Sequence, residues 1–225
     1  MNVIVIPARS GSKRIKNKNI KILNNKPLIT FLLDKFKGKK LKEKIFVSSD
    51  SNKIKKIVSN YKNINFVKRP KKLASDLSKI EEALIHVINK EKLKKKGWII
   101  TIQPNSPFIK YKTIKKIINL VKNTKTNCIM TVSKNNSDFW YKEKNNKNFV
   151  KRLFPKAPRN TQKRQPLFEE NSAIYATKIS YLLKTKKIFD QKNISYEISK
   201  IEGLDINDKL DFLIAESIIK NGYKI

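Results

Sequence analysis

Short runs of branched apolar residues alternate along this chain with longer segments in which apolar positions recur every three or four residues. The short runs predict strands over Asn2–Ile6, Lys44–Ser48, Ile64–Val67, Trp98–Ile102 and Asn127–Val132. The longer segments predict helices over Leu28–Phe36, Asn52–Tyr61, Ser78–Asn89 and Thr113–Val121. This alternation is typical of a parallel sheet flanked by helices, so we expect an α/β, Rossmann-like fold.

The helix predicted over Ser78–Asn89 opens with Ser78-Lys79-Ile80-Glu81, which is the pattern of a capping box. Further along, we expect strands at Ala173–Ala176 and Ile194–Ile198 and a final helix over Asp208–Lys220. The sequence shows no repeats and no linker. We therefore expect a single domain over residues 1–225.

The pattern changes after Ser133. Residues 137–164 are polar and irregular, and they include the aromatic residues Phe139, Trp140, Tyr141, Phe149 and Phe154. We interpret this segment as an inserted arm, since exposed aromatic side chains suit a dimer contact. A loop that folds back on its own core is the alternative.

The chain of 225 residues carries 52 basic and 18 acidic residues, which gives a net charge of +34. Such a charge is also found in nucleic-acid-binding proteins. The lysines, however, are spread over nearly every segment, and they accompany many asparagines and isoleucines, which A- and T-rich codons encode. We interpret them as genome bias on solvated surfaces and do not expect nucleic-acid binding. A polyanion-binding surface is the alternative.

Cys128 is the only cysteine, which excludes a disulfide within the chain and a cysteine-rich metal site. It lies in an apolar run and is expected to be a buried strand residue. Val3–Ile6 is too short for the apolar core of a signal peptide, and no run approaches the roughly 18 apolar residues of a membrane span. We therefore expect a soluble, cytoplasmic protein without a membrane partner.

The first predicted strand leads directly into the loop Pro7–Asn19, which contains Gly11, two serines and several cations. Ligands of open α/β sheets bind beyond the carboxyl ends of the strands, and such a loop can surround a polyphosphate. The loop is not a Walker A motif, and the five glycines lie too far apart for a dinucleotide fingerprint. Arg69 and Gln103 follow the third and fourth predicted strands, so three loops should converge on one edge.

Five motifs support a more specific interpretation. They are Ile6–Lys13 with Asn17–Asn19 and Lys26–Ile29, then Arg69–Asp76, Gln103–Pro107, Gln162–Tyr175, and Leu204–Asp208 with Ala215-Glu216. In this order, over almost the whole chain, they resemble the acylneuraminate cytidylyltransferases, which activate sialic acid and related nine-carbon sugars as CMP derivatives. The resemblance implies a fold of the nucleotide-diphospho-sugar transferase type, with a small dimerisation insertion at about 137–164, and a homodimer.

The resemblance implies transfer of CMP from CTP to the anomeric hydroxyl of a nonulosonic acid, a 2-keto-3-deoxy sugar acid, with release of pyrophosphate. Such a transfer needs alignment and charge neutralisation more than covalent chemistry. Lys18 and Arg9 are implied as catalytic residues. The implied nucleotide-binding residues are Ala8, Arg9, Ser12, Lys13, Asn19, Arg69 and Gln103.

On the sugar side, the resemblance implies contacts from Gln103, Arg164, Asn171 and Tyr175. The guanidinium of Arg164 could hold the sugar carboxylate through two hydrogen bonds. Gln103 could instead cap the sheet, and Tyr175 could pack in the core. The single histidine, His86, is expected to be exposed or hydrogen-bonded, and we identify no nucleophile.

Asp205 and Asn207 are the expected Mg²⁺ ligands, because one carboxylate with phosphate oxygens and water is a usual magnesium site. The family commonly has Asp-x-Asp here, whereas Asn207 brings no charge. Asp208 could serve as the N-cap of the last helix. Lys163, Phe168 and Ser172 stand where the family usually has Asp, Tyr and Gly, and these departures leave the acceptor sugar open.

Three alternatives follow from the sequence. A cytidylyltransferase for 3-deoxy-octulosonate would keep the fold and change the acceptor, although that group usually has Ser-Thr-Arg where this chain has Ser12-Lys13-Arg14. A non-enzymatic polyanion-binding protein would use the net positive charge. The departures at Asn207 and Ser172 would also fit an inactive transferase.

Overall fold

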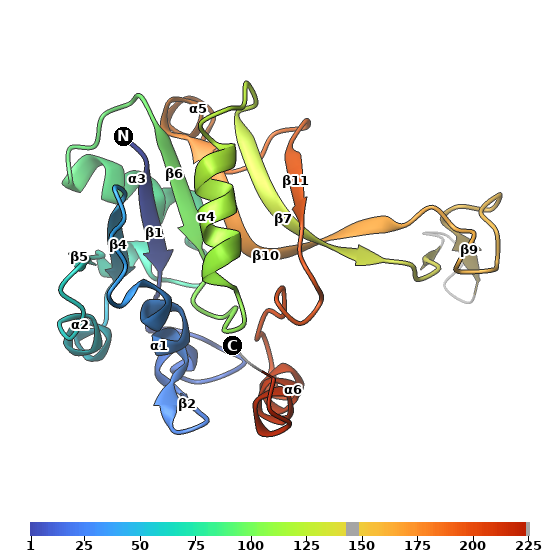
Figure 1. Ribbon diagram of the computed structural model, residues 1–225, viewed down its shortest axis with the longest axis horizontal. Helices are drawn as coiled ribbons and strands as arrows, with labels where there is room; N and C mark the ends of the chain where they lie inside the picture. Colours follow the sequence, from blue (N-terminus) through green and yellow to red (C-terminus); the bar gives the residue numbers. More distant parts are fainter. Residues whose placement is uncertain (143–148, 224–225) are drawn as a thin grey trace.

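The computed structural model describes residues 1–142 and 149–223. Its centre is a seven-stranded sheet with the strand order β11-β7-β10-β6-β1-β4-β5 (Figure 1). These strands are β1 (Val3–Pro7), β4 (Lys44–Ser49), β5 (Ile64–Lys68), β6 (Trp98–Ile102), β7 (Cys128–Asn135), β10 (Leu167–Lys178) and β11 (Ile194–Glu197). β1 pairs in parallel with β4 and β6, β4 with β5, and β7 with β11, whereas β10 is antiparallel to both its neighbours. The predicted Rossmann-like, mostly parallel sheet is confirmed.

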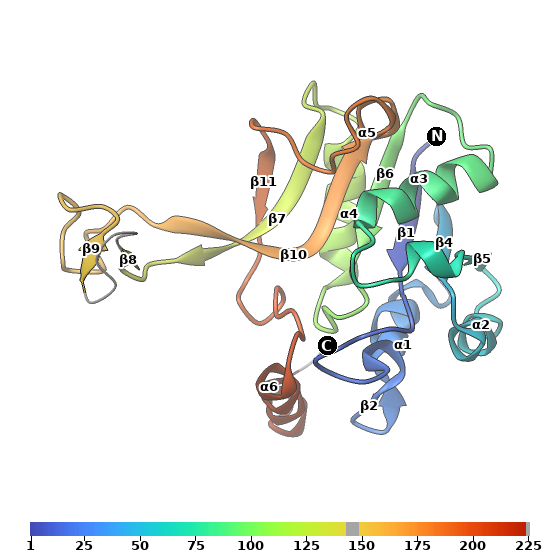
Figure 2. The same ribbon diagram turned by 180° about the vertical axis from the view of Figure 1, so that it is seen from behind.

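Helices cover both faces of the sheet, as Figures 1 and 2 show from opposite sides. One face carries α1 (Leu28–Leu33), α2 (Asn52–Val58) and α4 (Tyr111–Leu120), and the other carries α3 (Ile80–Lys90) and α5 (Ile179–Thr185). Successive side chains of a strand point to opposite faces. Ile4 and Ile6 of β1 accordingly pack in the first core, and Val3 and Val5 pack in the second.

A third apolar cluster lies beyond the carboxyl ends of the parallel strands. It joins α6 (Lys209–Lys220) to the small hairpin of β2 (Ile22–Leu23) and β3 (Lys26–Pro27), with Phe108 and Ile206 fully buried between them. This cluster holds the last segment of the chain against the loop that follows β1. Three 3₁₀ turns complete the body: η1 (Lys18–Ile20), η2 (Asp34–Phe36) and η3 (Lys71–Leu73).

β7 and β10 continue beyond the body as a long ribbon, which ends in the pair β8 (Trp140–Lys142) and β9 (Val150–Arg152). The ribbon projects to one side of the molecule (Figure 1). The aromatic residues of the predicted arm are exposed on it: Phe139, Trp140, Tyr141, Phe149 and Phe154. Residues 143–148 of the predicted arm lie outside the described part of the chain, and the dimer contact stays a prediction.

The predicted capping box of α3 is wrong by one residue. The helix begins at Ile80, and the backbone N–H of Lys79 donates to the carboxylate of Glu82 at 3.2 Å. Ser78 does not cap the helix, because its hydroxyl donates to the carbonyl of Lys72 at 2.8 Å. The glutamate half of the motif is therefore present without its serine half.

Two predictions about single residues can be compared with the structure. Cys128 is buried in β7 as expected, and burial raises the pKa of its thiol to about 11. His86 is half-buried rather than exposed, and its Nδ1 is buried without a hydrogen-bond partner among the described residues. Among those same residues, no helix is long and apolar enough to cross a membrane.

β10 bends where its pairing with β7 shifts register, between Glu170 and Tyr175. Ser172 lies in this bulge with a φ of 59°, in the left-handed region that disfavours residues with a Cβ. Its hydroxyl bonds the Tyr175 hydroxyl at 3.2 Å. A glycine at this position would therefore adopt the same backbone conformation with less strain.

The free energy of unfolding of Ser172→Gly is expected to exceed that of Ser172→Ala by about 1 kcal/mol. Both variants lose the hydroxyl, but only glycine adopts a positive φ without strain. Urea unfolding of both proteins measures the difference. An alanine variant as stable as the glycine variant would contradict this interpretation of the bulge.

Candidate functional site

A cavity of about 410 Å³ opens at the carboxyl ends of β1 and β6, where the loop Pro7–Asn19 meets three later segments. We call it the first cavity. Its walls come from four parts of the chain, brought together by the parallel strand order. They are Pro7, Arg9, Gly11, Ser12, Lys13, Arg14, Lys18, Asn19, Asp76, Gln103, Pro104, Asn105 and Asn207.

The loop after β1 is fixed from beneath by hydrogen bonds. The backbone N–H of Ser10 and its hydroxyl donate to the carboxylate of Asp50 at 2.8 and 2.5 Å. Asn19 is buried, and its amide donates to the carbonyl of Arg9 at 2.9 Å. The fully buried Ala8 uses its N–H on the carbonyl of Ser48 at 2.9 Å and does not line the cavity. Ala8 and Asn19 therefore both hold the shape of the loop, and of the two only Asn19 lines the cavity.

Two cations of the loop are paired across the mouth of the cavity. The guanidinium of Arg9 lies 2.9 Å from the carboxylate of Asp76, and the ammonium of Lys13 lies 3.2 Å from it. Arg9 also donates to the carbonyl of Ser75 at 2.6 Å. Hydrogen bonding from Lys13 is the main reason that the pKa of Asp76 lies below its usual value. An anionic ligand would have to compete with this carboxylate.

Lys18 approaches the cavity from the other side. It opens η1 directly after Asn17, which has a φ of 56°, and its ammonium donates to the carbonyl of Ile206 at 2.5 Å. Burial lowers the pKa of Lys18, and the nearby charge of Asp205 opposes this shift. A desolvated cation held by a neutral carbonyl is placed to interact strongly with an incoming anion.

Asp205 is the acidic centre of the segment before α6. Its carboxylate accepts hydrogen bonds from the side-chain amides of Asn105 and, at 2.7 Å, Asn207. Burial raises the pKa of Asp205. Arg14 donates to the amide oxygen of Asn207 at 3.2 Å, so a second cation reaches this point. Asp208 caps α6 as predicted, since its side chain accepts from the backbone N–H of Asp211 at 3.0 Å.

A second cavity of about 460 Å³ adjoins the first, and the two share Asn207. Its walls come from β7, the bulge of β10 and the segment before α6. They are Ser133, Glu169, Glu170, Asn171, Ser172, Lys200, Gly203, Leu204, Asp205, Asn207 and Asp211. Of the residues predicted to contact the sugar, only Asn171 lines this second cavity.

Asn171 is almost completely buried at the base of the second cavity. Its side chain accepts from the hydroxyl of Thr131 at 2.7 Å and donates to the hydroxyl of Ser133 at 3.0 Å. Gly203 approaches so closely that an added Cβ would lie 2.8 Å from both Asn171 and Ser133. Asn171 is therefore held rigidly, and glycine is the residue that fits beside it.

Besides Ala8, three predicted site residues line neither cavity: Arg69, Tyr175 and Arg164. Arg69 is buried behind the first cavity, where it donates to the hydroxyl and carbonyl of Ser48 at 3.1 and 2.8 Å, and burial lowers its pKa to about 10. Tyr175 lines neither cavity; it is packed in the core beside α3, and its hydroxyl donates to Glu170. Gln103 lines the first cavity alone, and its N–H donates to the carbonyl of Ala173 at 3.0 Å.

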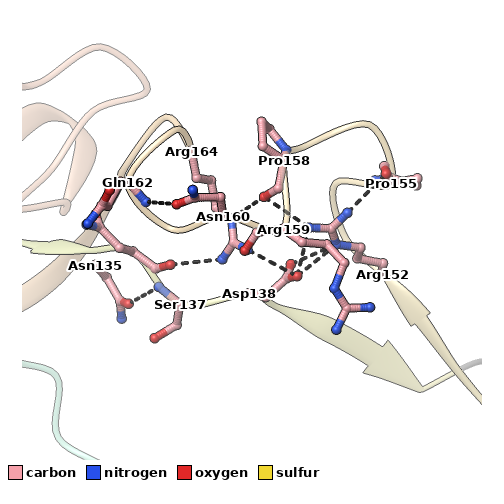
Figure 3. Close-up of polar contacts among 11 residues, drawn as sticks. Asn135, Ser137, Asp138, Arg152, Pro155, Pro158, Arg159, Asn160, Gln162 and Arg164 are labelled. Carbon is pink, nitrogen blue, oxygen red and sulfur yellow. Dashed lines mark hydrogen bonds and ion pairs between the residues drawn. The ribbon is translucent and has the colours of Figure 1, made fainter.

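Arg164, the third of these residues, lines neither cavity and lies in the arm, where Figure 3 shows its polar contacts. Its guanidinium donates to the carbonyls of Asn136, Pro158 and Arg159 at 2.9 to 3.1 Å and lies 3.4 Å from the carboxylate of Asp138. Arg152 shares that carboxylate at 2.8 Å. The structure therefore does not bring Arg164 together with the other predicted residues.

The sequence analysis assigned no role to three residues that line the first cavity: Arg14, Asp76 and Asn105. All three stand within or beside the recognised motifs. Asp76 and Asn105 reach the site because each is bound to another site residue: Asp76 forms an ion pair with Arg9, and Asn105 donates a hydrogen bond to Asp205. Pairing between segments so distant in the chain is not visible in spacing.

Asp205 and the amide oxygen of Asn207 supply only some of the ligands that a magnesium ion needs. Among the described residues there is no group of three or more His, Cys, Asp or Glu side chains that could hold a metal ion. Mg²⁺ is usually held by one or two carboxylates together with substrate phosphates and water. Asp205, with the amide oxygen of Asn207, therefore fits a magnesium ion that a phosphate ligand also coordinates.

The chain was compared with known proteins. Residues 3–218 match the family model described as Cytidylyltransferase. The N-acylneuraminate cytidylyltransferase of Escherichia coli O18:K1:H7 is 29% identical over 99% of this chain, which spans about half (54%) of that protein. The CMP-N,N'-diacetyllegionaminic acid synthase of Legionella pneumophila is 26% identical over 96% of this chain and 95% of its own length.

Among solved structures, a CMP:2-keto-3-deoxy-manno-octonic acid synthetase complexed with CTP matches this chain with a TM-score of 0.71. The match covers 98% of each chain at 15% sequence identity. At this identity the match supports the fold alone, and it agrees with the sheet order and the helical layers described above.

Asp76→Asn is expected to strengthen the binding of inorganic tripolyphosphate, because Arg9 and Lys13 would lose a competing carboxylate. The gain should stay below about fivefold, since exposed ion pairs contribute little. Isothermal titration at low ionic strength measures it. Asp34→Asn is the matched control, because Asp34 forms a comparable pair with Lys26 at 2.7 Å outside the cavity. Unchanged or weaker binding by Asp76→Asn would contradict the competition.

Proposed function

This chain belongs to the cytidylyltransferase family, and we propose that it transfers CMP from CTP to the anomeric hydroxyl of a nonulosonic sugar acid, with release of pyrophosphate. The observation that carries the proposal is a cationic cavity that adjoins a second, polar cavity at Asn207. Two substrates bound side by side would meet at this junction. The relatives named above, which make CMP derivatives of sialic-acid-like sugars, support this assignment.

The first cavity would hold the triphosphate of CTP. Four cationic side chains line it against a single carboxylate, a balance that favours a polyanion: Arg9, Lys13, Arg14 and Lys18 against Asp76. Gly11 and Ser12 add backbone N–H groups and a hydroxyl beside them. Gln103 and Asn19 line the same cavity and can offer polar contacts to the nucleoside.

The acceptor hydroxyl would attack the α-phosphate of CTP, and pyrophosphate would leave. The bond that forms joins the anomeric oxygen to phosphorus, the bond that breaks joins phosphorus to the bridging oxygen of pyrophosphate, and the proton of the attacking hydroxyl passes to water. Negative charge increases on the transferring phosphate and the leaving group during this step. Lys18, held against the segment that leads to the junction of the two cavities, and Arg9, in the wall of the first cavity, would neutralise that charge.

We propose Asp205 and Asn207 as the residues that hold Mg²⁺ together with the phosphates of CTP. When bound, the ion would supply further positive charge to the phosphates. Asn207 would have to turn its amide away from Asp205, to which it donates at 2.7 Å. Because Asn207 brings no charge, the ion should bind mainly together with the nucleotide.

Pyrophosphate release tests this function most directly. The protein is incubated with each nucleoside triphosphate in turn, with Mg²⁺, and with a panel that includes sialic, legionaminic, pseudaminic and 3-deoxy-octulosonic acids. We expect release with CTP and a nine-carbon acid, and loss of release when a chelator removes the metal. Release only with the eight-carbon acid would favour the related acceptor. Salt-dependent retention on DNA without any turnover would favour a polyanion-binding protein.

Lys18→Ala and Arg9→Ala are each expected to lower turnover by well over tenfold, since each removes a charge that stabilises the transition state. Lys16→Ala is the matched control, because Lys16 belongs to the same loop, is exposed and does not line the first cavity. Circular dichroism should show all three variants folded. Near-normal pyrophosphate release by the Lys18 and Arg9 variants would contradict the proposed roles.

We also propose a homodimer formed through the arm, in a cytoplasmic protein that does not act on nucleic acid. The exposed aromatic side chains of the arm support this contact, because several large apolar side chains exposed together on one segment are typical of a protein–protein interaction site. Trp140→Ser with Phe149→Ser is expected to convert the dimer to a monomer in sedimentation experiments. A monomeric parent protein would refute the dimer.

A further inference from the structure

Acidic side chains outnumber basic ones around the second cavity, whereas basic residues outnumber acidic ones in the chain as a whole. Basic residues outnumber acidic ones 52 to 18 in the sequence. Around this cavity, one basic side chain faces four acidic ones: Lys200 against Glu169, Glu170, Asp205 and Asp211. An anionic substrate would therefore find little compensation there, and its carboxylate needs a specific cation.

The four carboxylates of the second cavity already have partners within the protein. Glu169 accepts from the amide of Asn135 at 3.1 Å, and Glu170 accepts from the hydroxyl of Tyr175. Asp205 accepts from two asparagine side chains, and Asp211 accepts from the backbone N–H of Asn207 at 2.8 Å. These bonds fix the carboxylates as part of the wall.

Lys200 differs from them, because it is exposed and makes no hydrogen bond or ion pair to any of the residues that the structure describes. It stands on a tight turn, in which the N–H of Gly203 donates to the carbonyl of Ser199 at 2.9 Å. The turn is anchored from behind by buried Glu202, whose carboxylate accepts from the N–H of Lys110 at 3.0 Å. A fixed turn therefore presents a free ammonium to the cavity.

Arg164, the residue expected to bind the sugar carboxylate, already has hydrogen-bond partners among the described residues, unlike Lys200. Its guanidinium already donates to three backbone carbonyls in the arm and lies beside Asp138. Releasing it would leave those carbonyls without their donor, which costs free energy for each lost bond. Among the described residues that line the second cavity, Lys200 is the available cation, whereas Arg164 is bound within the arm.

We propose that Lys200 binds the carboxylate of the acceptor sugar acid and so selects an acid over a neutral sugar. This inference rests on the proposed function. The ammonium would donate charge-assisted hydrogen bonds to the carboxylate, and the polar groups of the second cavity would meet the sugar's hydroxyl and amide groups. Lys200 is then a substrate-binding residue that sets acceptor specificity and takes no part in the bond exchange.

The test compares the sugar acid that gives turnover with its carboxamide, which has the same shape and no charge. For the parent enzyme, we expect the KM of the acid to be at least about tenfold lower than that of the carboxamide, as for a charged hydrogen bond. Lys200→Met should raise the KM of the acid about tenfold, remove the preference for the acid, and leave the KM for CTP unchanged. Lys184→Met, at an exposed lysine on α5 outside both cavities, is the matched control.

Two results would overturn the proposal. The first is a Lys200→Met enzyme that keeps the parent's preference for the acid. The second is loss of that preference in Arg164→Gln but not in Lys200→Met, which would return the role to the arm. Both require a parent enzyme that releases pyrophosphate with CTP and some sugar acid. Absence of turnover in the parent refutes the proposed function itself, so the two failures are distinguishable.

Discussion

The hydrogen bond from the Lys18 ammonium to the carbonyl of Ile206 joins residues that are 188 positions apart in the sequence. The N–H of Ile206 donates in turn to the carbonyl of Asn105 at 2.9 Å, and the side chain of Asn105 donates to Asp205. These hydrogen bonds thus join the loop after β1, the loop after β6 and the segment before α6 to one another around Ile206. Because Ile206 is fully buried in the cluster beneath α6, this point cannot move independently of the core.

The two cavities on either side of this point differ in charge, and that difference assigns their ligands. The first has four cations, of which two are partly neutralised by Asp76, so it suits a polyanion that can displace a carboxylate. The charged residues that line the second are four carboxylates with partners in the protein and one lysine, Lys200, without a partner among the described residues. In the proposed function, a triphosphate binds in the first cavity, and a polyhydroxylated molecule with a single negative charge binds in the second. The shared junction at Asn207 is where the two would react.

Most of the buried parts of the fold could be predicted from the sequence, but α5, which buries Ile179 and Leu182, was not predicted. Apolar periodicity located the five core strands and four helices, because burial on one or two faces imposes that pattern. β10 was predicted only at Ala173–Ala176 and extends from Leu167 to Lys178. Its first half, which includes Phe168 and Glu169, leaves the body in the exposed ribbon and so carries no apolar alternation.

Sequence alone could predict those site residues that lie near one another in a single loop. Arg9, Lys13 and Lys18 lie together as the order of the loop after β1 suggested. Arg69 was expected in the same cavity because it follows a neighbouring strand, but its side chain turns back to Ser48. The direction of a side chain depends on partners that become adjacent only on folding. For the same reason, Arg164 was expected to contact the sugar, but its guanidinium is already bound within the arm, whereas Lys200, for which no role was predicted, lines the second cavity.

Hydrogen–deuterium exchange with and without CTP is the measurement that tests this account most directly. If the loops joined through Lys18 and Ile206 form the nucleotide site, CTP with Mg²⁺ should slow exchange in residues 7–19, 103–107 and 203–208. Exchange in the arm, at residues 149–164, should change far less. Slower exchange confined to the arm, or no change in the three loops at saturating CTP, would contradict the central claim.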